Sequence, residues 1–361
     1  MSVLFEPVTL GELQLANRIV MAPMTRSRAL VDAVPGSDMV EYYRQRAGAG
    51  LIVAEGTAPS ASGLGYCRTP GIYSVEQMAG WQRVTEAVHA EGGRIVLQLM
   101  HVGRAASRHN KPAGATTVAP SPVRALTQVF SDSHGLVDTD EPQALTLQGI
   151  NEVIEEYRQA ALNARQAGFD GVELHCTSGY LPMQFMASQS NLRSDAYGGD
   201  ADARVRFAKE VIEAMASAIG AGRVGYRQCP GNPYNDISDR DPAATATALC
   251  QAVAPLSLAY LHIMRSPLTD LDAFTLAREH SPHPLILNDG FDGLSASAAL
   301  AAGEGAAVSF GRHFIANPDL VERLKRGLPL SRFDRKSLYT PGSAGYSDYP
   351  AYQAIAQELA Q

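Results

Sequence analysis

Three side chains that can form hydrogen bonds lie within one short stretch of the sequence VELHCTSGYLPMQF, residues 172–185. His175 ends an apolar run, and Ser178 and Tyr180 follow on the next turn. His175 and Ser178 could hold a carbonyl or nitro oxygen and polarise a conjugated double bond, while Tyr180 could donate a proton. The spacing fits equally well a Tyr180 that caps a helix and a His175 that satisfies a buried backbone group.

The elements that position this stretch follow a strict alternation of apolar, β-rich runs and segments with helical periodicity. Examples of the helical segments are residues 75–91, 147–167 and 203–219. Alternation of this kind predicts parallel strands with right-handed crossovers, and eight such units close into a (β/α)₈ barrel. The eight expected strands are residues 18–24, 51–56, 94–100, 171–175, 224–227, 260–263, 284–288 and 306–310.

An open, doubly wound sheet is the structural alternative. That fold normally has a glycine-rich turn after its first strand, but the turn here reads APMTRSRA. The barrel is therefore preferred. Residues 4–17 contain two short β-like runs around Leu10 and Gly11, and we expect them to form a hairpin that plugs the barrel floor.

The domain organisation that we expect is one barrel domain over residues 1–361. The connection at residues 101–146 is too long for an ordinary loop and predicts a flap over the pocket, with a hairpin turning at Ser133, His134 and Gly135. Residues 329–361 form a tail, rich in turn residues, that leads to a final helix.

Composition excludes several classes of partner. The net charge of -7 argues against nucleic acid or an anionic membrane, because phosphate binding needs a basic surface. Glu6 and Glu12 lie where a signal peptide would be basic and then apolar, and no apolar run is long enough to span a bilayer. The four cysteines form no C-x-x-C pair. We expect a cytoplasmic enzyme for a small molecule, monomeric or a small homo-oligomer.

Active sites on this fold lie at the carboxyl ends of the strands, and here those ends are unusually polar. Inward-facing polar side chains imply a polar ligand between them. The strand ends hold Pro23, Met24, Thr25, Gly56, Thr57, Gln98, His175, Arg227, Asn288, Asp289, Gly290, Gly311 and Arg312.

The last two strands lead into the loops NDGF and FGRHFIANPDL, at the position where this fold often binds phosphate. Gly290 and Gly311 allow close approach of the backbone, and Arg312 supplies a charge-assisted fork for phosphate oxygens. One phosphate together with an inward Gln98 and Arg227 suits flavin mononucleotide (FMN). Gln98 could pair with the pyrimidine edge of the flavin, and Arg227 could stabilise the negative charge that develops at N1 and O2 on reduction.

Six motifs in their order along the chain resemble those of the old yellow enzyme family. They are NRIVMAPMTRSRA, LQLMHVGR, VELHCTSGYLPMQF, NLRSDAYGG, FGRHFIANPDL and GSAGYSDYP, and the resemblance covers residues 4–352. The resemblance implies an NAD(P)H-dependent ene-reductase with non-covalent FMN, acting on α,β-unsaturated carbonyls, maleimides or nitroalkenes.

The resemblance also implies roles for individual residues. Pro23, Met24 and Gly56 would pack on the isoalloxazine, and Thr25 would bond its O4. Aromatic side chains would line the substrate pocket at Tyr66 and Tyr339, which on their own could equally be packing tyrosines. Residues completing the FMN site would be Gln98, His175, Arg227, Asn288, Gly290, Gly311 and Arg312.

The implied mechanism is ping-pong. NADPH or NADH would reduce the flavin and leave, and the substrate would then stack over the same ring. Hydride would pass from flavin N5 to the β-carbon of the alkene, with His175 and Ser178 stabilising the oxygen and Tyr180 protonating the α-carbon.

Some positions depart from the family pattern. Relatives usually carry Asn or His at the position of Ser178, so the second oxygen-binding donor is shorter here. Either Ser178 reaches the substrate oxygen through a bridging water, or His175 acts alone. Met100 stands where many relatives have tryptophan, which should widen one wall of the substrate pocket. Asp289 would repel a phosphate, so we expect its carboxylate to point outward.

Other functions stay open at this point. A reductase of nitrate esters or nitroaromatics would use the same site, and a flavin-binding protein with little turnover would explain Ser178. A metal-dependent barrel hydrolase ranks low, because no strand offers a His-x-His pair or a carboxylate cluster.

Overall fold

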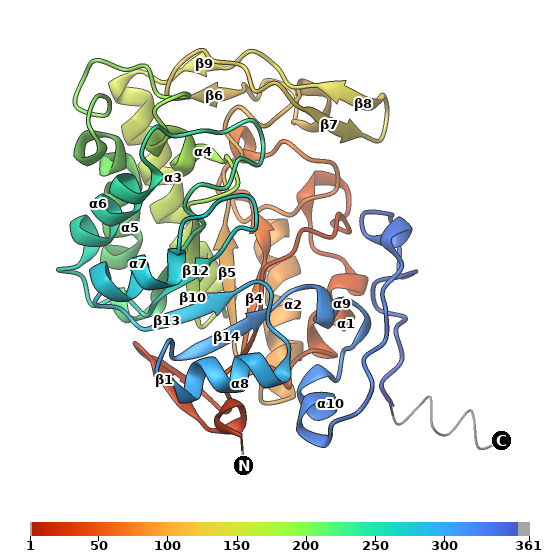
Figure 1. Ribbon diagram of the computed structural model, residues 1–361. Coiled ribbons are helices and arrows are strands. Elements are labelled where there is room, and N and C mark those ends of the chain that lie inside the picture. Colours follow the sequence, from red (N-terminus) through yellow and green to blue (C-terminus); the bar gives the residue numbers. More distant parts are fainter. Residues whose placement is uncertain (1, 353–361) are drawn as a thin grey trace.

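The computed structural model describes residues 2–352, and its centre is a closed barrel of eight parallel strands (Figure 1). The order around the barrel follows the sequence, so each strand pairs with the next, and the last pairs with the first. All eight strands that the sequence predicts are present. They are β3 (Ile19–Met21), β4 (Leu51–Thr57), β5 (Ile95–Leu99), β10 (Gly171–His175), β11 (Val224–Gln228), β12 (Tyr260–Met264), β13 (Leu285–Asn288) and β14 (Ala307–Phe310).

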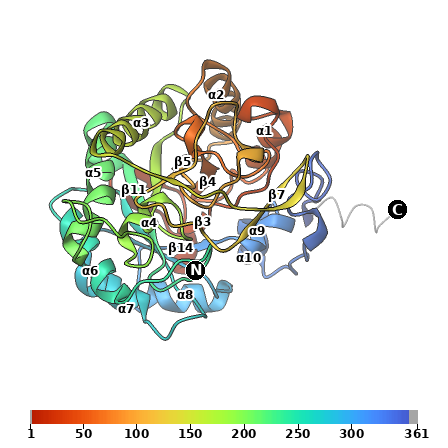
Figure 2. The same ribbon diagram turned by 90° about the horizontal axis from the view of Figure 1, so that it is seen from above.

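Helices surround the barrel as an outer ring, which Figure 2 shows from above. Their apolar faces pack against strands that are buried along their whole length, as expected for a parallel sheet covered by helices. The longer helices are α1 (Ser37–Arg44), α2 (Val75–Ala90), α3 (Leu147–Gln166), α5 (Ala201–Ile219), α6 (Pro242–Val253), α7 (Ala273–His280), α8 (Gly293–Ala301) and α10 (Leu320–Arg326). The short ones are α4 (Leu181–Met186) and α9 (Arg312–Ala316). Single 3₁₀ turns lie at Val3–Phe5, Val31–Ala33, Ala61–Gly63, Arg108–Asn110, Ala221–Arg223 and Arg335–Ser337.

The expected N-terminal hairpin closes the end of the barrel where the strands begin. It consists of β1 (Val8–Leu10) and β2 (Leu13–Leu15), paired antiparallel and drawn at the bottom of Figure 1. Its leucines enter an apolar cluster with residues from the first half of the barrel strands, among them Val20, Val53 and Ala307. Gly11 must be a glycine, because its φ is +56° and a Cβ would lie 2.5 Å from the carbonyl oxygen of Gly222.

The long connection at 101–146 lies at the opposite end of the barrel, as predicted (Figure 1). It carries the expected hairpin, β7 (Gln128–Ser131) with β8 (Gly135–Asp138), and a short parallel pair, β6 (Val118–Ala119) with β9 (Gln143–Ala144). The final helix predicted for the tail falls outside the described residues.

Candidate active site

A cavity of about 1060 Å³ opens at the carboxyl ends of the barrel strands. The loops after five strands contribute to it, and the hairpin of β7 and the tail around residues 333–341 complete the wall. Six of the residues that the sequence predicts for the site line this cavity, namely Met24, Thr25, Tyr66, Tyr180, Arg312 and Tyr339. Of the other predicted residues, Gln98, His175 and Arg227 are buried in the barrel, whereas Gly290 is exposed.

Tyr180 stands at the start of α4 and reaches into the cavity. It is a helix N-cap whose side chain makes no capping bond, so the capping role left open by the sequence is not what this hydroxyl does. Its ring meets the ring of His175 edge-on, with centroids 4.9 Å apart, and its hydroxyl donates to the hydroxyl oxygen of Tyr66 at 3.3 Å. Burial raises the pKa of Tyr180 well above its usual value, so the phenol keeps its proton at neutral pH.

His175 ends β10 and is buried, with its Nδ1 atom left without a hydrogen-bond partner among the described residues. Burial lowers the pKa of His175 to about 3, and the positive charge of Arg227 adds to this effect. The imidazole is therefore neutral at pH 7. A buried polar atom without a partner is costly, and a bound ligand would remove that cost.

Ser178 lies in the turn between β10 and α4 with a left-handed backbone, φ +59°. That conformation is unfavourable for most residues and is tolerated better by asparagine. The carbonyl oxygen of Ser178 accepts a hydrogen bond from Asn235 Nδ2 at 2.9 Å. The turn thus fixes the position of residue 178, while its short hydroxyl is not held by any bond to residues 2–352.

Asn235 and Tyr234 belong to the site although the sequence reasoning missed them. They lie in the loop after β11, where Tyr234 lines the cavity and the amide of Asn235 also donates to the Tyr66 hydroxyl at 3.3 Å. Asn235 therefore links the turn of Ser178 to the pair of Tyr66 and Tyr180. The run NPYND after the fifth barrel strand was the available signal, since loops at this end of the fold carry function.

Two glycines lie at strand ends beside the first barrel strand, and only Gly56 lacks room for a Cβ. A Cβ on Gly56 would lie 2.5 Å from the sulfur of Met100, so Met100 fills the space over this strand end. Met100 packs in a cluster with Tyr180 and Tyr66 and does not line the cavity directly. Gly311 brings the last strand end close to Met24, whose sulfur would be 3.5 Å from a Cβ there.

Below the cavity, polar side chains fill the interior of the barrel. Gln98 and Arg227 are buried, and Arg227 Nη2 donates to Oδ1 of Asn288 at 2.6 Å. Two further polar residues that the sequence reasoning missed join them, Glu173 and His262, both with 0% exposure. Their signal was present, because Glu173 and His175 alternate on one face of an apolar strand and His262 interrupts another.

The predicted phosphate loops meet at the same edge of the cavity. Gly290 has φ +74°, and Arg312 begins α9 directly after Gly311. The guanidinium of Arg312 is 3.2 Å from the carboxylate of Asp289, whose side chain is about one-third exposed. Asp289 therefore points to the surface beside Arg312. Arg265, which was not predicted, donates to the carbonyl oxygen of Asp289 at 2.9 Å.

Two buried arginines fasten the tail over the cavity. Arg26 donates to the carbonyl oxygens of Leu338 and Gly345, and Arg28 donates to those of Ser337, Leu338, Gly342 and Ala344. We call these contacts the arginine clamp. The β7–β8 hairpin is held on the other side by an ion pair of Arg68 with Asp132.

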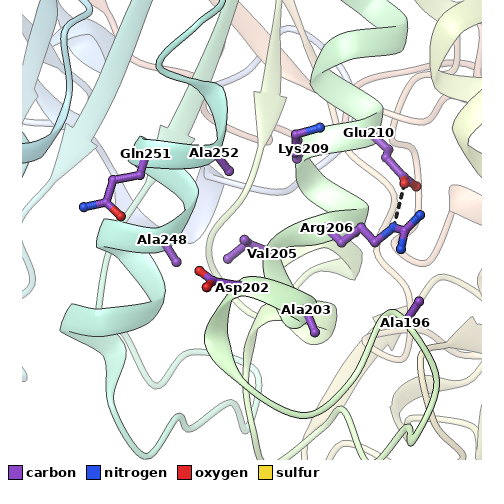
Figure 3. A pocket seen from close by; sticks show the side chains of 10 residues that line it. All are labelled: Ala196, Asp202, Ala203, Val205, Arg206, Lys209, Glu210, Ala248, Gln251 and Ala252. Carbon is purple, nitrogen blue, oxygen red and sulfur yellow. Dashed lines mark hydrogen bonds and ion pairs between the residues drawn. The ribbon is translucent and has the colours of Figure 1, made fainter.

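A second hollow, of about 700 Å³, lies between the outer helices α5 and α6 (Figure 3). Alanines and an ion pair of Arg206 with Glu210 line it, and none of the predicted site residues does. Within residues 2–352 no three His, Cys, Asp or Glu side chains are grouped so that they could hold a metal ion. None of the helices described is long and apolar enough to cross a membrane.

The residues present fit an FMN molecule. The barrel interior below the cavity offers Gln98 and Arg227, and the edge of the cavity offers Arg312 with the glycines of the phosphate loops. His175 Nδ1 has no hydrogen-bond partner among the described residues. Gln98 and Arg227 suit the polar edge of the flavin ring, Arg312 and the glycines suit its phosphate, and His175 suits a substrate stacked on the ring.

Comparison with known proteins agrees with this geometry. Residues 3–331 match the model of the NADH:flavin oxidoreductase / NADH oxidase family. The chain is 38% identical to 12-oxophytodienoate reductase 7 of Oryza sativa subsp. japonica, over 96% of this chain and 94% of that one. It is 39% identical to a probable flavin mononucleotide-dependent alkene reductase of Leishmania infantum, over 96% and 97%. Two solved structures of morphinone reductase are similar to this chain. One has a TM-score of 0.93 and 42% identity, over 98% of this chain and 97% of that one. The other, a complex with tetrahydroNAD, has a TM-score of 0.92 and 43% identity, over 96% of this chain and 97% of that one.

Proposed function

The chain belongs to the NADH:flavin oxidoreductase / NADH oxidase family, and from this premise we propose the roles of the site residues. It is an FMN-dependent oxidoreductase that uses NAD(P)H to reduce carbon–carbon double bonds. The resemblance to old yellow enzymes is thereby confirmed. We assign the substrate half-reaction to His175, Ser178 and Tyr180, and we propose alkenes activated by a carbonyl, imide or nitro group as substrates.

One observation carries the assignment. A neutral, buried His175 with a free Nδ1 lies edge to face with a protonated Tyr180, and Tyr180 lines the cavity. A neutral imidazole can donate a hydrogen bond to a substrate oxygen without repelling Arg227, and Ser178 would add a second, water-bridged bond. Tyr180 would give its proton to the α-carbon, with Tyr66 and Asn235 orienting its hydroxyl.

For the cofactor, we propose that Thr25, Gln98 and Arg227 hold the polar edges of the flavin ring, with Pro23, Met24 and Gly56 packed against it. Asn288, Gly290, Gly311 and Arg312 would hold its phosphate, by analogy with other barrels. When bound, the flavin supplies the hydride chemistry, taking hydride from the nicotinamide and giving it to the alkene.

The cavity mouth favours the phosphates of the nicotinamide coenzyme. Arg335 and Lys336 on the tail line the cavity together with Arg26, Arg68 and Arg312, whereas Asp132 is the carboxylate in the lining. This positive rim on an acidic protein would attract polyanions. Support for Tyr66 and Tyr339 as substrate-binding residues comes from their position, since both line the cavity.

We also propose that residues 1–361 act as one FMN-binding domain, in which 101–146 caps the pocket and 329–361 forms the tail. A cytoplasmic monomer or small homo-oligomer fits the four cysteines, all of which are free.

The experiment is an anaerobic absorbance titration of the purified protein. NADPH should bleach the flavin band, and 2-cyclohexenone added afterwards should restore it. Bleaching without recovery would contradict the proposed substrate class, and recovery with a nitrate ester alone would favour the alternative reductase. A colourless protein that FMN does not reconstitute would contradict the proposed cofactor site.

A further inference from the structure

Glu173 is a buried carboxylate that the reaction described above does not use. It lies in the middle of β10, beside Gln98 of β5 and Gly225 of β11, and Arg227 lies two residues further along β11. Its side chain has 0% exposure. A carboxylate in such a place is retained at a cost unless it is fully paired.

The two oxygens of Glu173 are used separately. Oε1 accepts a hydrogen bond from Nε2 of Gln98 at 2.8 Å, and Oε2 lies 2.8 Å from Nδ1 of His262. The other ring nitrogen of His262 lies 2.7 Å from the hydroxyl of Ser309. Because His262 bonds to residues on strands that are not its neighbours, this group of side chains lies inside the barrel.

Arg227 completes the group. Its Nη1 is 2.9 Å from Nε2 of His262, and its Nη2 donates to Asn288. Burial lowers the pKa of His262 to about 4, and Arg227 adds to this effect, so the imidazole is neutral. Burial alone would raise the pKa of Glu173, but the bonds from His262 and Gln98 and the charge of Arg227 hold it below its usual value. The barrel interior thus holds one cation and one anion.

We propose that Glu173 is a positioning residue that orients the amide of Gln98 and offsets the charge of Arg227, and thereby keeps the reduction potential of the bound flavin low. The inference rests on the proposed function, which places Gln98 and Arg227 at the polar edge of the flavin. Reduction adds negative charge at that edge, and a nearby cation favours the reduced form. A carboxylate behind the cation weakens this preference.

The test is the midpoint potential of FMN bound to the Glu173→Gln variant, measured by spectroelectrochemical titration. Glutamine keeps the size and removes the charge. Its amide oxygen can still accept the bond from Gln98, whereas its amide nitrogen can bond Nδ1 of His262 only when that imidazole carries its proton on Nε2. We expect the ratio of affinities for reduced and oxidised FMN to rise about tenfold, which for two electrons is a shift of about 30 mV to more positive values. An unchanged potential would overturn the inference.

A matched control is Asp319→Asn. Asp319 also pairs with a buried arginine, Arg323, at 2.7 Å, but on the outer helix α10. This variant should lose stability without moving the potential. A shift equal to that of Glu173→Gln would show a general effect of losing a carboxylate paired with a buried arginine and would overturn the inference as well.

A second comparison serves if Glu173→Gln alone does not fold. Removing both members of a buried ion pair is tolerated better than removing one. Arg227→Gln should lower the potential, and Glu173→Gln added to it should raise the potential again. Equal midpoint potentials of Arg227→Gln and of the double variant would contradict the inference that Glu173 offsets the charge of Arg227. Parent protein that binds no FMN would instead contradict the proposed function, so the two failures are distinguishable.

Discussion

The two ends of the barrel interior are filled by opposite kinds of side chain. Where the strands begin, Leu10, Leu13 and Leu15 of the hairpin pack with Val20 and other aliphatic residues. From the middle of the strands to their carboxyl ends, the interior holds Gln98, Glu173, His175, Arg227, His262, Asn288 and Ser309. The same eight strands therefore carry a hydrocarbon core at one end and a hydrogen-bonded network at the other.

The difference separates stability from function. Aliphatic burial stabilises the fold at roughly 25 cal/mol per Å² of apolar surface. The polar end instead leaves buried atoms unpartnered, including His175 Nδ1, Thr177 Oγ1 and Gln228 Nε2. Such atoms cost stability, and they persist where a ligand or water can complete them. Changes at the two ends should accordingly be seen by different measurements.

The largest expected effect is that of Tyr180→Phe at the polar end. Losing a positioned proton donor should slow alkene reduction by roughly 10²- to 10⁴-fold. Flavin reduction by NADPH should stay near the parent rate, because Tyr180 is not assigned to that step. Stopped-flow measurement of the two half-reactions checks this.

The control for this variant is Tyr197→Phe, which removes a phenol that bonds Glu210 at 2.7 Å on the outside of the barrel. It should leave both half-reactions unchanged. Equal slowing of both half-reactions in Tyr180→Phe would show that its phenol is not the proton donor.

At the other end, Leu13→Ala should cost about 2 to 5 kcal/mol of unfolding free energy, because it leaves a cavity in the closed floor. The rate constants of the folded enzyme should not change. Urea denaturation and steady-state kinetics measure the two quantities. A drop in kcat with unchanged stability would contradict the separation of the two ends.

Acid should destabilise the polar end selectively. Burial lowers the pKa of His101 and His175 to about 3 and that of His262 to about 4. Their neutral forms are favoured in the folded state, so this contribution is complete above the unfolded pKa of about 6.5 and is lost as the pH falls below it. Between pH 7.5 and 5.5 these histidines should lower the unfolding free energy by about 1 kcal/mol each. The buried carboxyl of Glu55, whose pKa burial raises to about 7, should offset part of this drop, because it takes up a proton in the folded state.

Urea denaturation at the two pH values measures this loss, and Leu13→Ala provides the internal reference. The deficit of Leu13→Ala relative to the parent should be the same at both pH values, because no titrating group is involved. Parent stability that does not change over this range would mean that these histidines titrate normally.

The smallest expected effect is a gain from Ser178→Asn. Asparagine suits the left-handed backbone at this position, and its longer amide would reach a substrate oxygen without a bridging water. We expect the rate of enone reduction to rise roughly tenfold, below the hundredfold that a full oxyanion donor contributes. A variant no faster than the parent would show that His175 acts alone.

Much of the fold was predictable because barrel strands and helices have strong local signals. All eight strands, the hairpin of Leu10 and Gly11 and the excursion at 101–146 follow from periodicity and length alone. At the site, Gln98 and Arg227 could be predicted because they lie at the ends of barrel strands, where buried polar side chains imply a polar ligand. The resemblance, and not spacing, favoured Tyr180 as a donor over a helix cap, and the residue roles remain predictions.

The missed residues share a physical cause. Glu173 and His262 are bonded to each other across the barrel from strands 89 positions apart in sequence, so no local pattern pairs them. Asn235 acts through an amide in an irregular loop. Met100 shows the reverse limitation, since its place in the sequence suggested a cavity wall whereas packing against Gly56 buries it behind Tyr180 and Tyr66.

The arginine clamp determines when the active site can exist during synthesis. Arg26 bonds the carbonyl of Leu338, which lies 312 positions later in the chain. At usual translation speeds these two residues leave the ribosome tens of seconds apart, and earlier parts of a chain generally fold first. The barrel can therefore assemble around an open cavity whose wall is completed only as the end of the nascent chain docks.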